Sequence, residues 1–215
     1  MGSDIFYEMP EYAGEAISVV GVFLLVYFII ILGAMAISIT MYLLQSFGLY
    51  KIGGTLKIEN PWLAFIPVAN IYMLGKIAEA APTVPGKKPR KYSTLLLWLS
   101  LATIGVFIIG YIVIIIMAVL TSGTAITMSE STAAMGGAVV TVILAGIVWY
   151  AAIMGTTITY MVFYYIALHK VFKLFAPENA VLYTVLSIIL GIHPILLFII
   201  RKKMPVFENQ AYQTV

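Results

Sequence analysis

The amino-acid sequence predicts an all-α integral membrane protein with three long transmembrane helices. Composition is the first reason, because 62% of the 215 residues are hydrophobic, only 10% are charged, and the mean hydropathy is +1.06. Soluble domains are typically about 45–50% apolar and about 25% charged, so a water-soluble fold of this size could not cover so much apolar surface. Three long uncharged runs and a one-sided distribution of basic residues are the other two reasons.

The uncharged runs extend from Ala16 to Leu44, from Thr94 to Thr121 and from Ala138 to Leu168. Each is longer than the roughly 20 apolar residues that a helix needs to cross a bilayer. The first run is too long for the apolar core of a cleaved signal peptide, and no basic residue precedes it, so we expect it to be retained. The small and polar residues from Ser122 to Gly137 predict a solvent-exposed loop between the second and third helices.

Two further apolar stretches are interrupted by helix-breaking residues. The first begins at Asn60 and contains Pro61 and Pro67, which remove backbone donors and disfavour a continuous helix. It is short and broken, which predicts an interfacial or re-entrant segment after the first helix. The second, Val181 to Ile200, is broken at Gly191-Ile192-His193-Pro194. It predicts a proline-broken C-terminal re-entrant hairpin, with a fourth span as the alternative.

The basic residues indicate which way each segment faces. All 12 Lys and Arg lie in the segment 45–93, just after the third run, or at 201–203. Cytoplasmic segments carry the Lys/Arg excess, so we expect the N-terminus and the 122–137 loop outside and the 45–93 loop and the C-terminus inside. The re-entrant hairpin is favoured over a fourth span because it keeps the 201–203 cations inside. The predicted location is the inner (cytoplasmic) membrane of a cell.

A weak internal repeat recurs at an offset of 119 residues within the single membrane domain 1–215. Leu49-Tyr50-Lys51 is matched by Leu168-His169-Lys170, and Glu59-Asn60 by Glu178-Asn179. Each set follows an aromatic-rich helix end and precedes a broken apolar stretch. The pattern predicts a parallel duplication contained within 1–93 and 138–203. Such repeats occur in transporters, and they also arise by gene duplication in scaffolding proteins.

The polar residues of this repeat are candidate functional residues. Glu59, Asn60, Glu178 and Asn179 could form a polar pair where two re-entrant segments meet. Helix capping is the simpler interpretation, because asparagine is a favoured N-cap residue and Pro61 suits the first helical position.

His193 is the only ionisable residue inside a candidate membrane segment. Ionisable groups within the membrane are candidates for function, and histidine titrates near neutral pH. The alternative is a structural role, in which the imidazole bonds a backbone carbonyl that Pro194 leaves free.

The cluster Lys87, Lys88, Arg90 and Lys91 is a candidate contact for lipid headgroups. The simpler interpretation is a solvated determinant of orientation. Nucleic-acid binding is not expected, because the basic residues lie beside membrane segments.

No catalytic, cofactor-binding or metal-binding motif is present in the sequence. Cysteine is absent, and none of the motifs of hydrolases, zinc proteases or nucleotide-binding loops occurs. The sequence therefore predicts a non-enzymatic protein without a cofactor, whose partners are the bilayer and other membrane subunits or a second copy of itself. An accessory or structural subunit of a membrane assembly is the leading hypothesis. The alternative is a small channel or transporter with a pathway between the two re-entrant units.

The segment Asn60-Pro61-Trp62-Leu63-Ala64-Phe65-Ile66-Pro67 resembles an Asn-Pro-Trp-x-Ala-x-Ile-Pro element. Uncharacterised bacterial polytopic membrane proteins carry that element soon after their first span. The stretch from Leu186 to Arg201 is similar to the C-terminal part of the same proteins. The resemblance implies a protein of the bacterial cell membrane and implies no particular activity.

The predicted orientation can be tested with single cysteines, since the chain has none of its own. A membrane-impermeant maleimide should label Lys88→Cys only after the membrane is permeabilised, because cationic segments do not cross lipid readily. Glu130→Cys, in the predicted outer loop, should be labelled in intact spheroplasts. Labelling of Lys88→Cys from outside would invert the predicted orientation.

Overall fold

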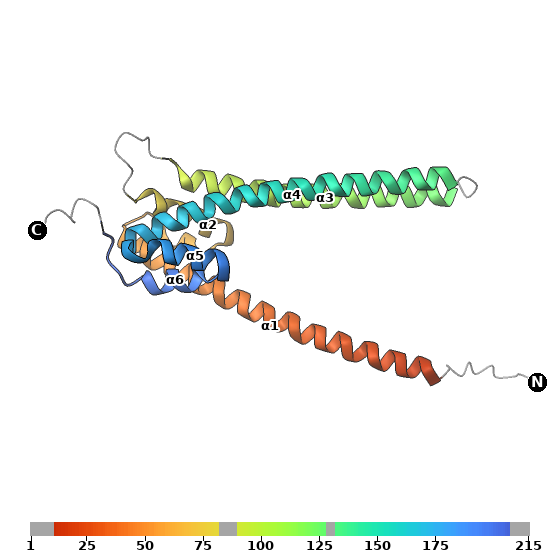
Figure 1. Ribbon diagram of the computed structural model, residues 1–215, viewed down its shortest axis with the longest axis horizontal. Helices are drawn as coiled ribbons and strands as arrows, with labels where there is room; N and C mark the ends of the chain where they lie inside the picture. Colours follow the sequence, from red (N-terminus) through yellow and green to blue (C-terminus); the bar gives the residue numbers. More distant parts are fainter. Residues whose placement is uncertain (1–10, 82–89, 128–131, 207–215) are drawn as a thin grey trace, which may run out of the picture. The chain divides into compact units, whose positions relative to one another are not determined.

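The computed structural model describes residues 11–81, 90–127 and 132–206, and every regular element in those ranges is helical (Figure 1). The chain forms two compact units, Met1–Leu43 and Leu44–Val215. Helix α1 (Glu11–Thr55) belongs to both, and the second unit contains all later elements. These are η1 (Pro61–Phe65), α2 (Pro67–Glu79), α3 (Tyr92–Thr127), α4 (Thr132–Phe175), η2 (Pro177–Asn179), α5 (Ala180–Leu190) and α6 (His193–Ile200).

Three helices are long and apolar enough to cross a membrane, as the sequence predicted. The qualifying segments, called the spans below, are Val20–Thr55, Tyr92–Leu120 and Val139–Phe175. Several threonine hydroxyls inside them bond within their own helix. The hydroxyls of Thr103 and Thr159, for example, donate to the carbonyls of Leu99 and Gly155 at 2.9 and 2.8 Å. A hydroxyl bonded in this way can face lipid at little cost.

Helices α1, α3 and α4 extend further than the uncharged runs indicated. Helix α1 continues to Thr55, so the first part of the predicted 45–93 connection is helical. Residues 122–127 and 132–137 are also helical, so the prediction of a loop over 122–137 is wrong for these positions. The physical reason is that alanine favours helix and that threonine and glycine lower helix stability by about 1 kcal/mol or less each, whereas proline, which stops a helix, is absent there.

The end of α1 is set by a backbone motif. The amides of Lys57 and Ile58 donate to the carbonyls of Gly54 and Gly53 at 3.1 and 3.0 Å. Lys57 has φ 53°, so these bonds form a Schellman motif with a lysine in the left-handed position that glycine usually occupies. Asn60 is also left-handed, at φ 56°. Two left-handed residues within four positions turn the chain out of α1 and into η1.

The C-terminal apolar stretch is divided where the sequence predicted a break. Helix α5 ends at Leu190, Gly191 adopts φ 65° with its amide 3.1 Å from the Ser187 carbonyl, and α6 begins at His193 with Pro194 in its first turn. Helices of 11 and 8 residues measure about 17 and 12 Å, so neither alone crosses a bilayer. Whether the pair re-enters the lipid stays a prediction.

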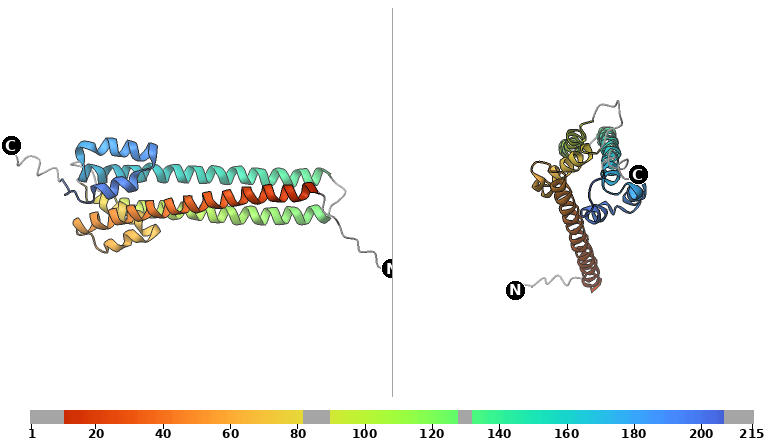
Figure 2. Two further views of the ribbon diagram at one scale, coloured as in Figure 1. Left: turned by 90° about the horizontal axis from the view of Figure 1, so that it is seen from below. Right: turned by 90° about the vertical axis from the view of Figure 1, so that its left-hand side faces the viewer.

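The buried core of the second unit lies at one end of it, called the core end below. There α2, α5 and α6 surround the last turns of α1 and α4, while α3 and α4 continue side by side beyond them (Figure 2). The largest fully buried side chains are Leu49, Ile52, Met73, Leu74, Ile77, Leu96, Leu168, Phe172, Leu174, Phe175, Leu197 and Ile200. The short helices thus pack against the ends of the long ones.

Helices α2 and α3 approach most closely at Gly75. A side-chain carbon at this position would fall on the backbone of Ser93. One turn later, the Glu79 carboxylate accepts the Ser93 amide at 2.8 Å and the Ser93 hydroxyl at 2.7 Å. An acidic group at a helix N-terminus satisfies free amides and favours the helix dipole. The corner between α2 and α3 is therefore stabilised by the backbone contact at Gly75 and by the hydrogen bonds of the Glu79 carboxylate.

Helices α3 and α4 are joined by a tryptophan in a glycine notch. The Trp149 indole lies against Gly110, where any side chain would collide with it. Its N–H donates to the Val106 carbonyl at 3.1 Å, and its ring lies 6.0 Å from that of Phe107. An interhelical hydrogen bond between two spans fixes their register.

Gly75→Ala is expected to lower stability by about 2 kcal/mol, because the added methyl group forces α2 away from the Ser93 backbone. Gly105→Ala in α3 is the matched control, since nothing lies within 4 Å of the added carbon. The control should leave stability unchanged or raise it slightly, as alanine favours helix. Thermal unfolding of both variants in one detergent, followed by circular dichroism, measures the difference. Equal stability of the two variants would contradict the close approach.

Candidate functional site

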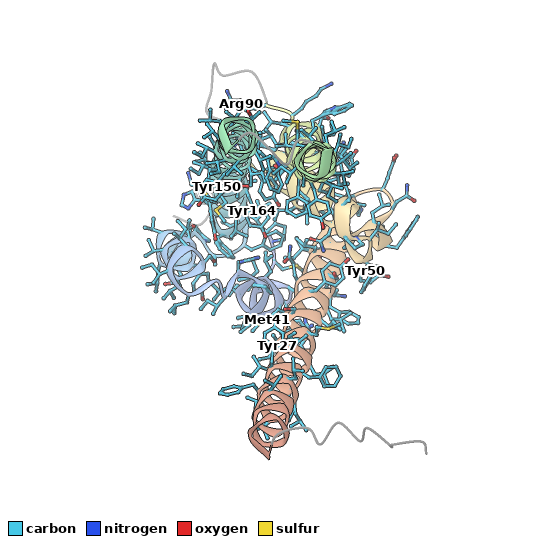
Figure 3. The ribbon with its side chains drawn as sticks, turned by 90° about the vertical axis from the view of Figure 1, so that its right-hand side faces the viewer. Tyr27, Met41, Tyr50, Arg90, Tyr150 and Tyr164 are labelled. Carbon is cyan, nitrogen blue, oxygen red and sulfur yellow. The ribbon has the colours of Figure 1, made fainter. Side chains whose placement is uncertain are left out.

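A buried cluster of polar side chains at the core end is the strongest candidate site. It brings together Gln45 and Ser46 from α1, Asn70 from α2, Tyr164 from α4 and His193 from α6. Figure 3 shows Tyr164 among the side chains that fill this part of the unit. Buried polar groups in an otherwise apolar core have either a structural or a functional reason.

Asn70 is the centre of the hydrogen bonding. Its amide nitrogen donates to the Ala64 carbonyl at 2.6 Å and to the Ser46 hydroxyl at 3.2 Å. Its amide oxygen accepts from Gln45 Nε2 at 2.7 Å. Both donor hydrogens and the acceptor are therefore used. Asn70 connects η1, α1 and α2, which is what a residue that holds the fold would do.

Tyr164 connects this hydrogen-bonded group to the aromatic side of the cluster. Its hydroxyl accepts a long bond, 3.4 Å, from Gln45 Nε2. Its ring lies 5.4 Å from that of His193 at an interplanar angle of 77°, and 5.6 Å from that of Tyr165. Edge-to-face pairs of this kind are favourable. Tyr164 therefore faces both the amide network and the imidazole.

His193 is the unsatisfied member of the cluster. Its Nδ1 is buried and has no hydrogen-bond partner among the described residues, so the imidazole makes no bond through Nδ1 to a carbonyl that Pro194 leaves free. Burial lowers the pKa of the imidazole from 6.5 to about 4, so His193 is neutral near pH 7. A neutral imidazole with one unpaired nitrogen can form one hydrogen bond with a ligand or with water. Among the residues that the structure describes, no carboxylate or hydroxyl bonds Nδ1.

The second histidine is bonded differently. His169 Nδ1 lies 2.9 Å from the Thr184 hydroxyl, which itself donates to the Ala180 carbonyl at 2.7 Å. Because that hydroxyl hydrogen is used, His169 must donate from Nδ1. The bond ties α4 to α5, and Tyr165 adds a second link by donating to the Ser187 carbonyl at 3.4 Å. Both contacts hold the α5–α6 pair against α4.

The four candidate polar residues of the repeat lie apart from this cluster. Glu59, Asn60 and Glu178 are exposed, and Asn179 is half-buried. Asn60 and Asn179 occupy N-cap positions of η1 and α5, as capping predicts, but neither side chain makes the capping hydrogen bond. Among the described residues, the two pairs form no hydrogen bond with each other. The repeat and the roles of these residues stay predictions.

Half of the predicted headgroup cluster can be placed. Lys87 and Lys88 lie outside the described residues. Arg90 is exposed with its guanidinium 5.7 Å from the Phe163 ring, and Lys91 is exposed at the start of α3. A cation above an aromatic ring at the end of a span is typical of an interfacial anchor.

Sequence reasoning missed Gln45, Asn70 and Tyr164. One signal for Asn70 was available, since it is the single amide side chain between Pro61 and Lys76. A second signal was the offset, because Gln45 and Tyr164 are separated by the same 119 residues as the repeat. Within the described part of the chain, no group of three or more His, Cys, Asp or Glu could hold a metal ion.

The chain matches no family model, no curated protein and no solved structure. The geometry of the cluster and of the spans is therefore what bears on function.

Asn70→Ala should lower stability by about 2 kcal/mol, since it leaves the buried Ser46 hydroxyl and Ala64 carbonyl without this partner and removes the shorter of two bonds made by the half-buried Gln45 amide. Tyr164→Phe is the matched control. It removes only one long bond and keeps the ring contact with His193, so its effect should stay well below 1 kcal/mol. Chemical unfolding in mixed micelles gives both values. A greater loss for Tyr164→Phe would show that the tyrosine, and not the asparagine, holds the cluster.

Proposed function

We propose that the protein is a non-enzymatic integral membrane protein that serves as an accessory or structural subunit of a membrane assembly. Its partners would be other membrane subunits or a second copy of this chain. The cluster at the core end supports this, because both amide hydrogens and the amide oxygen of Asn70 are bonded inside the protein. A rigid core end would hold the spans in fixed positions for partners to bind.

The single observation that carries the proposal is an uncovered small-residue face on α4. Ala151 and Gly155 are exposed, and nothing lies within 4 Å of a carbon added to Gly155. Small residues four positions apart let two membrane helices approach closely. Helix α3 packs on a different face of α4, the one that presents Trp149. Within the unit Leu44–Val215, the small-residue face is thus free to pack against a further helix.

The location proposed is the inner membrane of a bacterial cell, with the N-terminus outside and the C-terminus in the cytoplasm. The positions of the basic residues support it, because all 12 lie in segments that would share one side.

Photo-crosslinking in cells tests the subunit role directly. Val148 and Val162 share the helix face of Ala151 and Gly155, since helix neighbours recur every three, four or seven residues. A photoreactive amino acid at either position should give one crosslinked protein product of fixed mass. Ile143 and Met161 are the matched controls, because they are also exposed but lie on another face of α4. They should crosslink to lipid.

Two outcomes would overturn the proposal. One is the absence of any protein crosslink at Val148 and Val162. The other is crosslinking that is equal on both faces of α4, which would indicate random collisions in the bilayer.

A small channel or transporter is the second candidate, and the unpaired Nδ1 of His193 favours it. The pathway would lie between the two predicted re-entrant segments, one after α1 and the other after α4. An unsatisfied imidazole beside Gly191 and Pro194 could bind a passing polar solute. Solute flux into liposomes that His193→Ala abolishes would replace the subunit proposal with this one.

A further inference from the structure

A pocket at the core end is lined by three cations and two aromatic rings. Phe47, Tyr50 and Lys51 come from the last turns of α1, and Arg201 and Lys202 follow α6. The pocket has a volume of about 330 Å³. Tyr50 lies at the outer surface of the unit (Figure 3). None of these residues belongs to the candidate cluster Lys87, Lys88, Arg90 and Lys91.

The pocket exists because two helices meet at a glycine. A side-chain carbon on Gly48 would lie 3.0 Å from the backbone of Leu197, so α1 and α6 cross there with almost no space between them. Lys51 lies three residues after Gly48, and Arg201 lies four residues after Leu197. One helical turn beyond the crossing, each helix therefore presents a cation toward the same space.

Backbone bonds hold the second side of the pocket. The Lys203 amide donates to the Ile200 carbonyl at 2.9 Å, which closes a turn around Arg201 and Lys202. The Val206 amide then donates to the Leu174 carbonyl at 2.8 Å and ties the following segment to α4. The Arg201 guanidinium lies 3.2 Å from the centre of the Phe198 ring, which restricts its orientation. The cations are thus positioned and not simply scattered on the surface.

The positive charge in the pocket has no carboxylate partner among residues 11–81, 90–127 and 132–206. Among the described residues, the ion pair that forms is between Lys76 and Glu79, and no carboxylate pairs with Lys51, Arg201 or Lys202. Like charges brought together repel one another, and an anion between them removes that cost. A phosphate group is well suited, because arginine can bind two of its oxygens and lysine supplies a further charge.

The aromatic rings indicate where the phosphate would come from. Phe47 and Tyr50 lie at the end of the span Val20–Thr55 and are 48% and 44% exposed. Aromatic residues at span ends lie at headgroup depth, where their rings contact the upper part of lipid chains. We propose that the pocket binds the phosphate of an anionic phospholipid headgroup, with Phe47 and Tyr50 beside the acyl chains. This site requires the protein to lie in a bilayer but does not require the proposed subunit role.

Native mass spectrometry of the full chain in neutral detergent tests the site. Phosphatidylglycerol should bind saturably at one site, and phosphatidylcholine should bind far more weakly. The triple variant Lys51→Gln, Arg201→Gln and Lys202→Gln should weaken phosphatidylglycerol binding roughly 100-fold, at about fivefold for each cation removed near the headgroups. If circular dichroism shows that the triple variant does not fold, Lys202→Gln alone should weaken binding about fivefold.

The matched control removes the same number of positive charges at positions outside the pocket. Lys57→Gln, Lys173→Gln and Lys203→Gln remove three exposed cations that do not line the pocket. This control should bind phosphatidylglycerol as the unaltered protein does. Equal losses in the two triple variants would overturn the site, because a general surface potential would then explain binding. Complete displacement of the lipid by millimolar inorganic phosphate would also overturn it, since the pocket would then take a soluble anion.

Discussion

The absence of water in the hydrocarbon layer is the constraint on which the structure depends. Every backbone amide and carbonyl there must be bonded within the protein, so a chain can cross only as a continuous helix. The three spans meet this requirement, and their threonines bond to carbonyls of their own helix. The breaks in the chain, at Lys57–Asn60, at Ala176 and at Gly191, all belong to the core end, where the buried side chains gather. Among the described residues, the irregular backbone thus lies in the region that can cover it.

The polar cluster follows from the same constraint. Turning the chain from α1 through η1 into α2 leaves carbonyls that a helix would have used, and Asn70 takes the one at Ala64. The amide of Asn70 then needs partners of its own, which Gln45 and Ser46 supply. The burial of the Asn70 side chain is therefore explained by the hydrogen bonds that the turn from α1 into α2 requires. His193 is not explained in this way, because its Nδ1 adds no bond to the network.

Cations and aromatic rings recur together at the core end. Lys170 lies 4.6 Å above the Tyr92 ring, Arg201 lies 3.2 Å above Phe198, and Arg90 lies 5.7 Å from Phe163. Such pairs let a charged group lie beside apolar surface without a carboxylate partner. They leave the positive charge uncompensated, which suits a surface that meets anionic headgroups. In the proposed phosphate pocket, one of these cations, Arg201, converges with Lys51 and Lys202.

The sequence by itself determined the apolar character of the chain, the number of helices long enough to cross a membrane and the break at Gly191-Ile192-His193-Pro194. These properties follow from local quantities, since hydrophobic length and backbone-breaking residues act over about one helix. It also singled out His193, because an ionisable residue in an apolar run is conspicuous. The residues at which helices end were harder to predict from the sequence. The end of α1 at Thr55 is an example, because a Schellman motif with lysine in the left-handed position has no distinctive composition.

Only the tertiary structure decided which residues meet. Gln45, Asn70 and Tyr164 are unremarkable in the sequence, and the pocket joins Lys51 to Arg201 across 150 positions of the chain. Their proximity depends on Gly48 and Gly75, where missing side chains let backbones approach. A glycine in the sequence does not reveal whether the space beside it is open, as at Gly155, or filled by another helix, as at Gly75. That distinction depends on how the helices pack, which is a property of the whole fold and not of any one segment.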